Sequence, residues 1–335
     1  MGGARRGDDT DPLVLLHDPI NERRHPFRRG LRAPISIDMT SDPETLAVMA
    51  DRLWKAQAGG VPGIAGLTVI RFERELGILP TVYHPSWLLL LRGRKEGVFA
   101  GEPMAIAAGE GMLINCDSPV SARIRDATPA WPYIALRLEL DRDAVAGLLV
   151  EGADSAAPAE PLRRFRRAQA GAELLSAIGR LMAMSDDPAE EAALGPLVRR
   201  EILWRLLTSP LGPQLRHFGA VESTEARISA VAAYIRVHHA EALRVADLAA
   251  MAHMSVPTFH RRFKAVTTMS PVTFQKRVRL QIARELLLSP GDIAAIGYRV
   301  GYGSASQFSR DYRSLYGLPP GRHGAELRAM AAGTG

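Results

Sequence analysis

The chain has 335 residues, 47% of them apolar, and is therefore long enough to bury the cores of two domains. No apolar run approaches the roughly 18–20 residues of a membrane helix, and the single cysteine, Cys116, excludes an internal disulfide. The net charge of +6 is concentrated at the carboxyl end: from Glu222 onward the chain has 15 Lys and Arg but only 8 Asp and Glu. This excess of positive charge favours a polyanionic partner. A basic surface that is simply solvated is the alternative.

The first residues of the chain have no hydrophobic periodicity. They mix Arg, Asp, Pro and Gly, which predicts a disordered N-terminal extension over 1–40. Met39 is a candidate translation start within that stretch. A helix is expected directly after it, because Asp42 suits the N-cap position and Pro43 suits the first turn.

Short apolar or alternating runs occupy about 62–140 and are separated by glycines and prolines. Many short strands at this spacing are typical of a β-sandwich or barrel, so 41–140 is expected to form a β-barrel domain. Strands are expected to stop at residue 141, because amphipathic helical patterns with Pro- and Ala-rich connections follow. The region 141–215 is therefore predicted to be helical, with the arginines of 163–167 on a solvated helix face.

The segment 222–325 is dense in helical patterns and contains a weak internal repeat at an offset of 49 residues. In each copy a short helix and a tight turn precede a second helix with a serine at its N-cap. Two short helices joined in this way form a helix-turn-helix, whose second helix here has an aromatic stripe for the core. The matched pairs are Ser255 with Ser304, Phe259 with Phe308, Arg261 with Arg310, Phe263 with Tyr312, Lys264 with Arg313, and Pro271 with Pro320.

The outward faces of the two second helices carry hydroxyls, amides and cations, which bind base edges and phosphates in the major groove. Between the copies, the periodic stretch 270–288 predicts one helix of about 18 residues, roughly 27 Å long. Such a spacer suits two recognition helices in successive major grooves, about 34 Å apart. An ordinary helical bundle with polar outer faces is the alternative. The predicted DNA contacts on these faces are Thr258, His260, Arg261, Lys264, Ser306, Gln307, Ser309, Arg310 and Arg313.

Two stretches carry a family resemblance: "VADLAAMAHMSVPTFHRRFKAVTTMSPVTFQKRVRLQIARELLL" and "IAAIGYRVGYGSASQFSRDYRSLYGLPP". They resemble the DNA-binding domain of AraC/XylS-type transcription regulators. The resemblance implies that both helix-turn-helices meet promoter DNA, usually at asymmetric sites. The base-reading positions it implies are Pro257, His260 and Arg261 in the first motif, and Ser306, Ser309 and Arg310 in the second.

The first motif departs from the family pattern at two positions. His253 stands where the turn often has Gly, but His tolerates a positive φ better than most residues, so the turn is expected to survive. Pro257 replaces a commonly polar residue and cannot hydrogen-bond a base through its side chain. We therefore expect this departure to affect sequence specificity in the first recognition helix.

The stretches "LTVIRFERELGILPTVYHPSWLLLLRGRKEGVFAGEPMAIAAGEGMLINCDSPVSARI" and "PYIALRLELD" resemble the cupin-like N-terminal domain of one AraC subgroup. The resemblance implies a small β-barrel that binds an effector, with nearby helices for dimerisation. The subgroup often has Glu where this chain has His84, which bears on ligand choice. Effector-pocket candidates are Tyr83, His84, Trp87 and Cys116; simple core packing is the alternative for the aromatics and for the cysteine.

A cupin-like barrel also suggests a metalloenzyme, but such a site needs two or three His with a carboxylate at close spacing. His84 is the only histidine between residues 26 and 216. We therefore predict no metal, no cofactor and no catalytic residue. The rival interpretation is a cupin-fold enzyme fused to a nucleic-acid-binding domain, and a second rival is an effector-independent architectural DNA binder.

The sequence thus predicts an α+β protein of two domains, with a cupin-like β-barrel and flanking helices before an all-α domain of two helix-turn-helix motifs. We predict a sequence-specific transcription regulator controlled by a small molecule. Its expected partners are double-stranded promoter DNA, a second copy of the chain and, if it is an activator, RNA polymerase. A lone cysteine fits a reducing compartment, so a cytoplasmic protein is expected, with no membrane partner.

Overall fold

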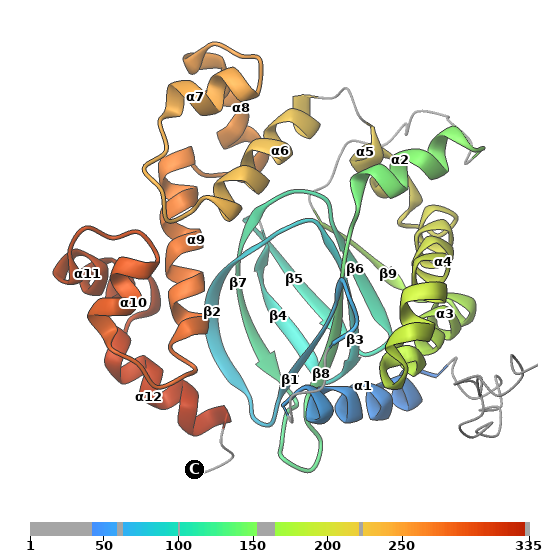
Figure 1. Cartoon of the computed structure of the whole chain (residues 1–335). Coiled ribbons are helices and arrows are strands. Elements are labelled where there is room, and N and C mark those ends of the chain that lie inside the picture. The colour runs from blue at the N-terminus through green and yellow to red at the C-terminus, as the bar shows by residue number, and fades with distance from the viewer. Residues whose placement is uncertain (1–41, 59–62, 100, 153–164, 221–223, 332–335) are drawn as a thin grey trace, which may run out of the picture. The chain divides into compact units, whose positions relative to one another are not determined.

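The structure is a computed structural model that describes residues 42–58, 63–99, 101–152, 165–220 and 224–331 (Figure 1). The extension predicted over 1–40 lies outside the described residues. The described residues all belong to one compact unit.

The first half of the described chain is a β-domain, as predicted. Its strands form two antiparallel sheets, with orders β1-β8-β3-β6-β9 and β2-β7-β4-β5, and not a single closed cylinder. Apart from the helices at 43–58 and 142–150, the strands precede the helices along the chain, which confirms the α+β class. The strands are β1 (Leu67–Phe72), β2 (Leu76–Tyr83), β3 (Ser86–Arg92), β4 (Arg94–Phe99), β5 (Glu102–Ala107), β6 (Glu110–Ile114), β7 (Ser118–Arg125), β8 (Tyr133–Glu139) and β9 (Phe165–Gln169).

Strand β3 explains the longest apolar run of the sequence. Side chains of a strand alternate between its two faces, and both faces of β3 are buried. Trp87 and Leu89 pack into a core shared with the helices, whereas Leu88 and Leu90 pack between the two sheets. A strand covered on both sides needs no polar residue, which is why five apolar residues follow one another here.

One sequence prediction about this region is wrong. The sequence predicts a helix for the arginine cluster at 163–167, of which 163–164 lie outside the described residues; Phe165–Gln169 instead forms strand β9, which pairs antiparallel with β6. Phe165 is buried between the sheets against Phe99, with ring centroids 5.4 Å apart. The pattern of one buried residue among arginines is that of an edge strand with a solvated face, where Arg167 pairs with Glu110 at 2.7 Å.

Helices cover the outer face of the five-stranded sheet (Figure 1). The first begins as predicted, because Pro43 is its first residue and the Asp42 carboxylate accepts a hydrogen bond from the Thr45 amide at 3.2 Å. These helices are α1 (Pro43–Ala58), α2 (Arg142–Val150), α3 (Ala172–Ala183), α4 (Pro188–Leu207) and α5 (Gly212–Gly219), with a short 3-10 turn, η2 (Met184–Asp186), between α3 and α4.

The second half of the chain is all-helical and has two cores that share one helix. Phe274 and Val278 of α9 pack into the first core, and Leu280 and Ala283 of the same helix pack into the second. The helix has 16 residues, close to the predicted spacer. The helices are α6 (Thr224–Val237), α7 (Val245–Met251), α8 (Val256–Thr267), α9 (Pro271–Leu286), α10 (Ile293–Arg299), α11 (Ala305–Tyr316) and α12 (Pro320–Ala331).

Candidate nucleic-acid interface

The first helix-turn-helix is formed by α7, a tight turn and α8. The turn depends on His253, which adopts φ of 54° in the left-handed region. The prediction that histidine can replace glycine there is thereby confirmed. Helix α8 starts after Ser255, whose hydroxyl donates to the Thr258 hydroxyl at 3.0 Å, and it ends at Thr268, also with positive φ.

The second helix-turn-helix repeats this plan with α10 and α11. Its left-handed residue is Gly301, with φ of +93°, and an added Cβ would lie 2.4 Å from the carbonyl oxygen of Ala240. Glycine is therefore required here both by the backbone angle and by the close approach. The hydroxyl of Ser304 accepts from the Gln307 amide at 3.4 Å, and α11 ends at Gly317 with positive φ.

The aromatic residues of both recognition helices, α8 and α11, are buried as predicted. Phe259, Phe263, Phe308 and Tyr312 are each fully buried. Rings of adjacent turns meet in tilted or edge arrangements, such as Phe308 and Tyr312 with centroids 5.6 Å apart. The Tyr312 hydroxyl also has a buried partner, Nδ1 of His323, at 3.0 Å. Each recognition helix is thus fixed on one side and free on the other.

The opposite faces of α8 and α11 present the predicted DNA-contacting side chains to solvent. Within the described part of the chain, Arg261, Lys264, Arg310 and Arg313 form no ion pair, so their charges remain available for phosphates and bases. Of the ten predicted contact residues, the exposed ones are Pro257, His260, Arg261, Lys264, Ser306, Gln307, Arg310 and Arg313, and the half-buried ones are Thr258 and Ser309.

Sequence reasoning missed two arginines that join neighbouring helices of the second half of the chain. Arg279 of α9 donates to the carbonyl oxygen of His239, after the end of α6, at 2.6 Å. Arg328 of α12 donates in the same way to the Leu287 carbonyl, at the end of α9, at 2.7 Å. These arginines are 49 residues apart, so the repeat offset itself was the signal that would have found them.

A further link joins the shared helix to the second recognition helix. Lys276 of α9 pairs with Asp311 of α11 at 2.7 Å. Arg262 stands at the matching place in α8, 49 residues before Asp311, and is exposed. The first recognition helix therefore carries a denser positive charge than the second.

We expect Arg310→Ala to weaken binding to promoter DNA by about 5–150-fold, since a bidentate arginine–guanine contact contributes about 1–3 kcal/mol. The melting temperature should stay nearly unchanged, because Arg310 is exposed and makes no ion pair within the described residues. Fluorescence anisotropy and thermal unfolding measure the two effects. Arg52→Ala, which removes an exposed arginine on α1, is the control for net charge; equal affinities for R310A and R52A would contradict the contact.

The four predicted effector-pocket residues lie in different surroundings. Tyr83 packs against the core between the sheets, and its hydroxyl bonds to Nζ of Lys95. Trp87 is buried under the helices, where it borders a cavity of about 280 Å³. His84 lines a cavity of about 590 Å³, and Cys116 lines one of about 160 Å³.

The chemistry of these positions favours structural or binding roles. Burial lowers the pKa of His84 to about 4, and the nearby charges of Arg137 and Arg236 add to the effect, so its imidazole is neutral at neutral pH. Cys116 is buried in the turn before β7 and contacts the Ser118 hydroxyl. Among the described residues, no group of three His, Cys, Asp or Glu is placed to hold a metal ion. None of the helices described is both long and apolar enough to cross a membrane.

Two family profiles match the chain. Residues 63–214 match the AraC-type transcriptional regulator N-terminus, and residues 248–325 match a helix-turn-helix domain. The first range covers all the described strands with α2, α3 and α4, and the second runs from within α7 through α11. The chain belongs to the AraC family of transcriptional regulators. In this AraC-family regulator, the DNA-binding function therefore falls on the paired motifs described above.

Relatives of known name agree with this assignment. The HTH-type transcriptional activator RhaS of Klebsiella pneumoniae is 24% identical over 262 residues, which cover 76% of this chain and 92% of RhaS. RhaS of Citrobacter koseri is 29% identical over 147 residues, 44% of this chain. The latter match spans about half of that relative, 52% of its length.

Solved structures of ToxT from Vibrio cholerae share the fold. A lysine-to-alanine variant of ToxT in its apo form superposes with a TM-score of 0.56 at 10% identity and covers 78% of this chain and 98% of ToxT. Wild-type ToxT bound to an unsaturated fatty acid gives the same score at 12% identity, covering 79% and 96%. At these identities the likeness establishes the fold alone.

Proposed function

We propose that this AraC-family regulator binds asymmetric promoter sites in the cytoplasm with α8 and α11, under the control of a small molecule, and that it catalyses no reaction. The observation that carries the proposal is the pair of exposed cationic faces on aromatic-anchored helices. Because α9 belongs to both cores, the spacing between the two helices is fixed. If the regulator activates transcription, RNA polymerase is a further partner.

Footprinting on DNA upstream of its own gene and its neighbours tests the proposal. We expect protection of two segments about one helical turn apart, on one face of the duplex. Inserting about five base pairs between those segments should abolish binding, since half a turn moves one segment to the opposite face. Uniform, sequence-independent protection would contradict recognition of specific sites and would favour an architectural DNA binder instead.

Control by a small molecule is supported by the cavities that border the β-domain and by the fatty acid bound to the structural relative ToxT. A turnover assay in which His84→Ala abolished a reaction would favour the enzyme alternative. The imidazole of His84 is neutral and half-buried, and no carboxylate among the described residues is hydrogen-bonded to it, which makes it a poor general base.

A second copy of the chain is proposed as a partner through the outer face of α4. This face exposes Leu197 to 62% and Trp204 to 42%, with Arg200 and Glu201 between them. In an antiparallel two-fold pair of α4 helices, Leu197 of one copy would meet Trp204 of the other. The same register places Arg200 beside Glu201 of the other copy twice, although within its own chain Arg200 already pairs with Glu151 and Glu201 with Arg180 and Arg205, so the self-complementarity rests on the apolar contact.

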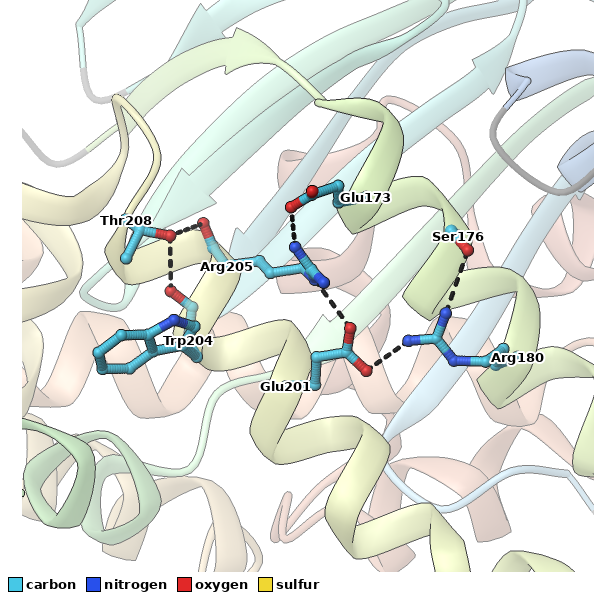
Figure 2. A network of polar contacts seen from close by, with 7 residues as sticks. All are labelled: Glu173, Ser176, Arg180, Glu201, Trp204, Arg205 and Thr208. Atoms are coloured by element: carbon cyan, nitrogen blue, oxygen red, sulfur yellow. Dashed lines mark hydrogen bonds and ion pairs between the residues drawn. The ribbon is translucent and has the colours of Figure 1, made fainter. Parts of the chain in front are cut away.

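A polar network holds this face in position (Figure 2). Arg205 bonds to Glu201 at 2.8 Å and also to Glu173, while Arg180 bonds to Glu201 and to the Ser176 hydroxyl. Burial alone would raise the pKa of Glu201, but the hydrogen bonds from Arg180 and Arg205 outweigh it and lower that pKa. The network ties α3 to α4, so the exposed side chains are presented by a rigid pair of helices.

We expect Leu197→Glu to convert a dimer into a 36.4 kDa monomer, because two carboxylates would be buried against apolar partners. Sedimentation velocity measures the mass, and Ile78→Glu is the matched control on a strand residue exposed to 68%. An unchanged mass distribution in L197E, or equal loss of dimer in both variants, would rule out this face.

A further inference from the structure

A cavity of about 590 Å³ lies where the end of β8 and the residues before β3 meet α2 and α6. Its apolar wall includes the Phe218 ring and three alanines of α6, and its polar wall contains Arg142, Arg227 and Arg236. The volume is that of a site for a small organic molecule. An apolar wall beside clustered guanidinium groups suits a molecule that has both an apolar part and a negative charge.

The charges of the cavity are unbalanced. Three guanidinium groups face one carboxylate, Glu139, which is exposed. Arg236 has a partner, Asp117, but within the described residues neither Arg142 nor Arg227 forms an ion pair. Arg142 instead donates to the carbonyl oxygen of Phe218 and lies 4.4 Å from the centroid of its ring. Among the described residues, no carboxylate therefore neutralises the charges of Arg142 and Arg227.

Arg142 and Arg227 differ in how they are held. Arg142 is fixed by the Phe218 carbonyl and ring and is partly buried, so its position changes little. Arg227 is exposed on α6 and can turn toward a ligand that enters from solvent. Guanidinium groups recognise carboxylates and phosphates through paired hydrogen bonds, which a neutral ligand would leave unused.

We propose that this cavity binds the effector, and that the effector is an organic anion: a carboxylate or phosphate ester with an apolar body. The acid group would lie between Arg142 and Arg227, and the apolar body would lie against Phe218 and the alanines of α6. The inference rests on the proposed control by a small molecule and names its chemical class.

The walls of the cavity come from the β-domain with α2 and α5 on one side, and from the first helix of the DNA-binding domain on the other. A ligand that contacts both sides binds only when they are together, so its binding stabilises their contact. Effector binding would thereby be coupled to the DNA-binding domain without reaching the recognition helices.

Isothermal titration of the full chain with matched probes tests the inference. The probes are 4-phenylbutyrate, phenyl phosphate, the neutral 4-phenyl-1-butanol, and inorganic phosphate. We expect binding of an acid with an apolar body to be at least about tenfold tighter than binding of the alcohol, and tighter than that of inorganic phosphate. Comparing the affinities of 4-phenylbutyrate and phenyl phosphate shows whether the cavity prefers a carboxylate or a phosphate ester.

Arg227→Gln should weaken binding of the acid at least about tenfold and leave binding of the alcohol unchanged. Arg52→Gln is the control and should bind like the parent. Equal affinity for acid and alcohol, equal affinity of the parent and R227Q, or no acid binding at millimolar concentration would each overturn the inference. Because the titrations contain no DNA, these outcomes are independent of the footprint that tests DNA recognition.

Discussion

Phe308→Ala should lower the free energy of unfolding of the DNA-binding domain by about 3–5 kcal/mol, because it removes a fully buried ring from a closely packed core. The ring contacts Tyr302 and Tyr312 with centroid distances of 5.4 and 5.6 Å, and it lies under Gly297, where no side chain could fill the space. The cost therefore includes both the lost burial of the ring and a cavity that the surroundings cannot close. Phe263→Ala should have an effect of similar size in the first motif, where Phe263 touches Phe259 and Phe274.

Chemical denaturation followed by circular dichroism measures the loss of stability. DNA affinity measured at low temperature, where the variant is still folded, separates lost stability from lost DNA contacts. Arg313→Ala is the control on the same helix: it should weaken DNA binding and leave the unfolding midpoint unchanged, since Arg313 is exposed. The opposite result, a stable F308A that cannot distinguish DNA sequences, would mean that the aromatic stripe contacts the DNA.

The part of the fold that the sequence predicted best is the part whose signals are local. The buried aromatic residues, Ser304 as an N-cap and the positive φ at His253 each follow from residues within one or two turns. Strand β3 could be predicted for the same reason, because a strand with two buried faces gives an unbroken apolar run.

The features that were missed depend on contacts distant in sequence. Strand β9 has only Phe165 to mark it, and its pairing with β6 decides its structure across more than fifty residues. Arg279 looked like one more surface charge in a basic helix, yet it holds the carbonyls at the end of α6. The candidate effector-pocket residues, such as Tyr83, were predicted from their residue type alone. The wall of a cavity is formed by tertiary packing between distant segments, which no local sequence pattern encodes.

Arg236→Met should destabilise the protein by about 3–5 kcal/mol at neutral pH, because it leaves Asp117 as an uncompensated buried carboxylate. Asp117 precedes β7 and is almost completely buried, and one of its carboxylate oxygens has no hydrogen-bond partner among the described residues. Arg236 on α6 supplies the compensating charge. The pair thus ties the β-domain to the first helix of the DNA-binding domain, next to the proposed effector cavity.

The double variant Asp117→Asn, Arg236→Met should recover most of that loss, since it removes both charges and leaves groups of similar shape. The single D117N should cost less than R236M, because a neutral amide tolerates burial better than an unpaired carboxylate. Denaturant unfolding of the four proteins gives the coupling energy. Independent, additive effects of the two changes would show that the pair does not form.

The pH dependence of R236M provides a separate test. Burial raises the pKa of Asp117 above its usual value of 3.8, and Arg236 opposes that rise, so removing Arg236 raises the pKa further. A carboxyl whose pKa is higher in the folded state binds protons more tightly there, and its unfavourable charge is lost as the pH falls through that raised pKa. The stability deficit of R236M, measured against the double variant so that other groups such as His84 cancel, should therefore shrink on acidification. A deficit that stays constant or grows would mean that Asp117 is not the charge left unpaired.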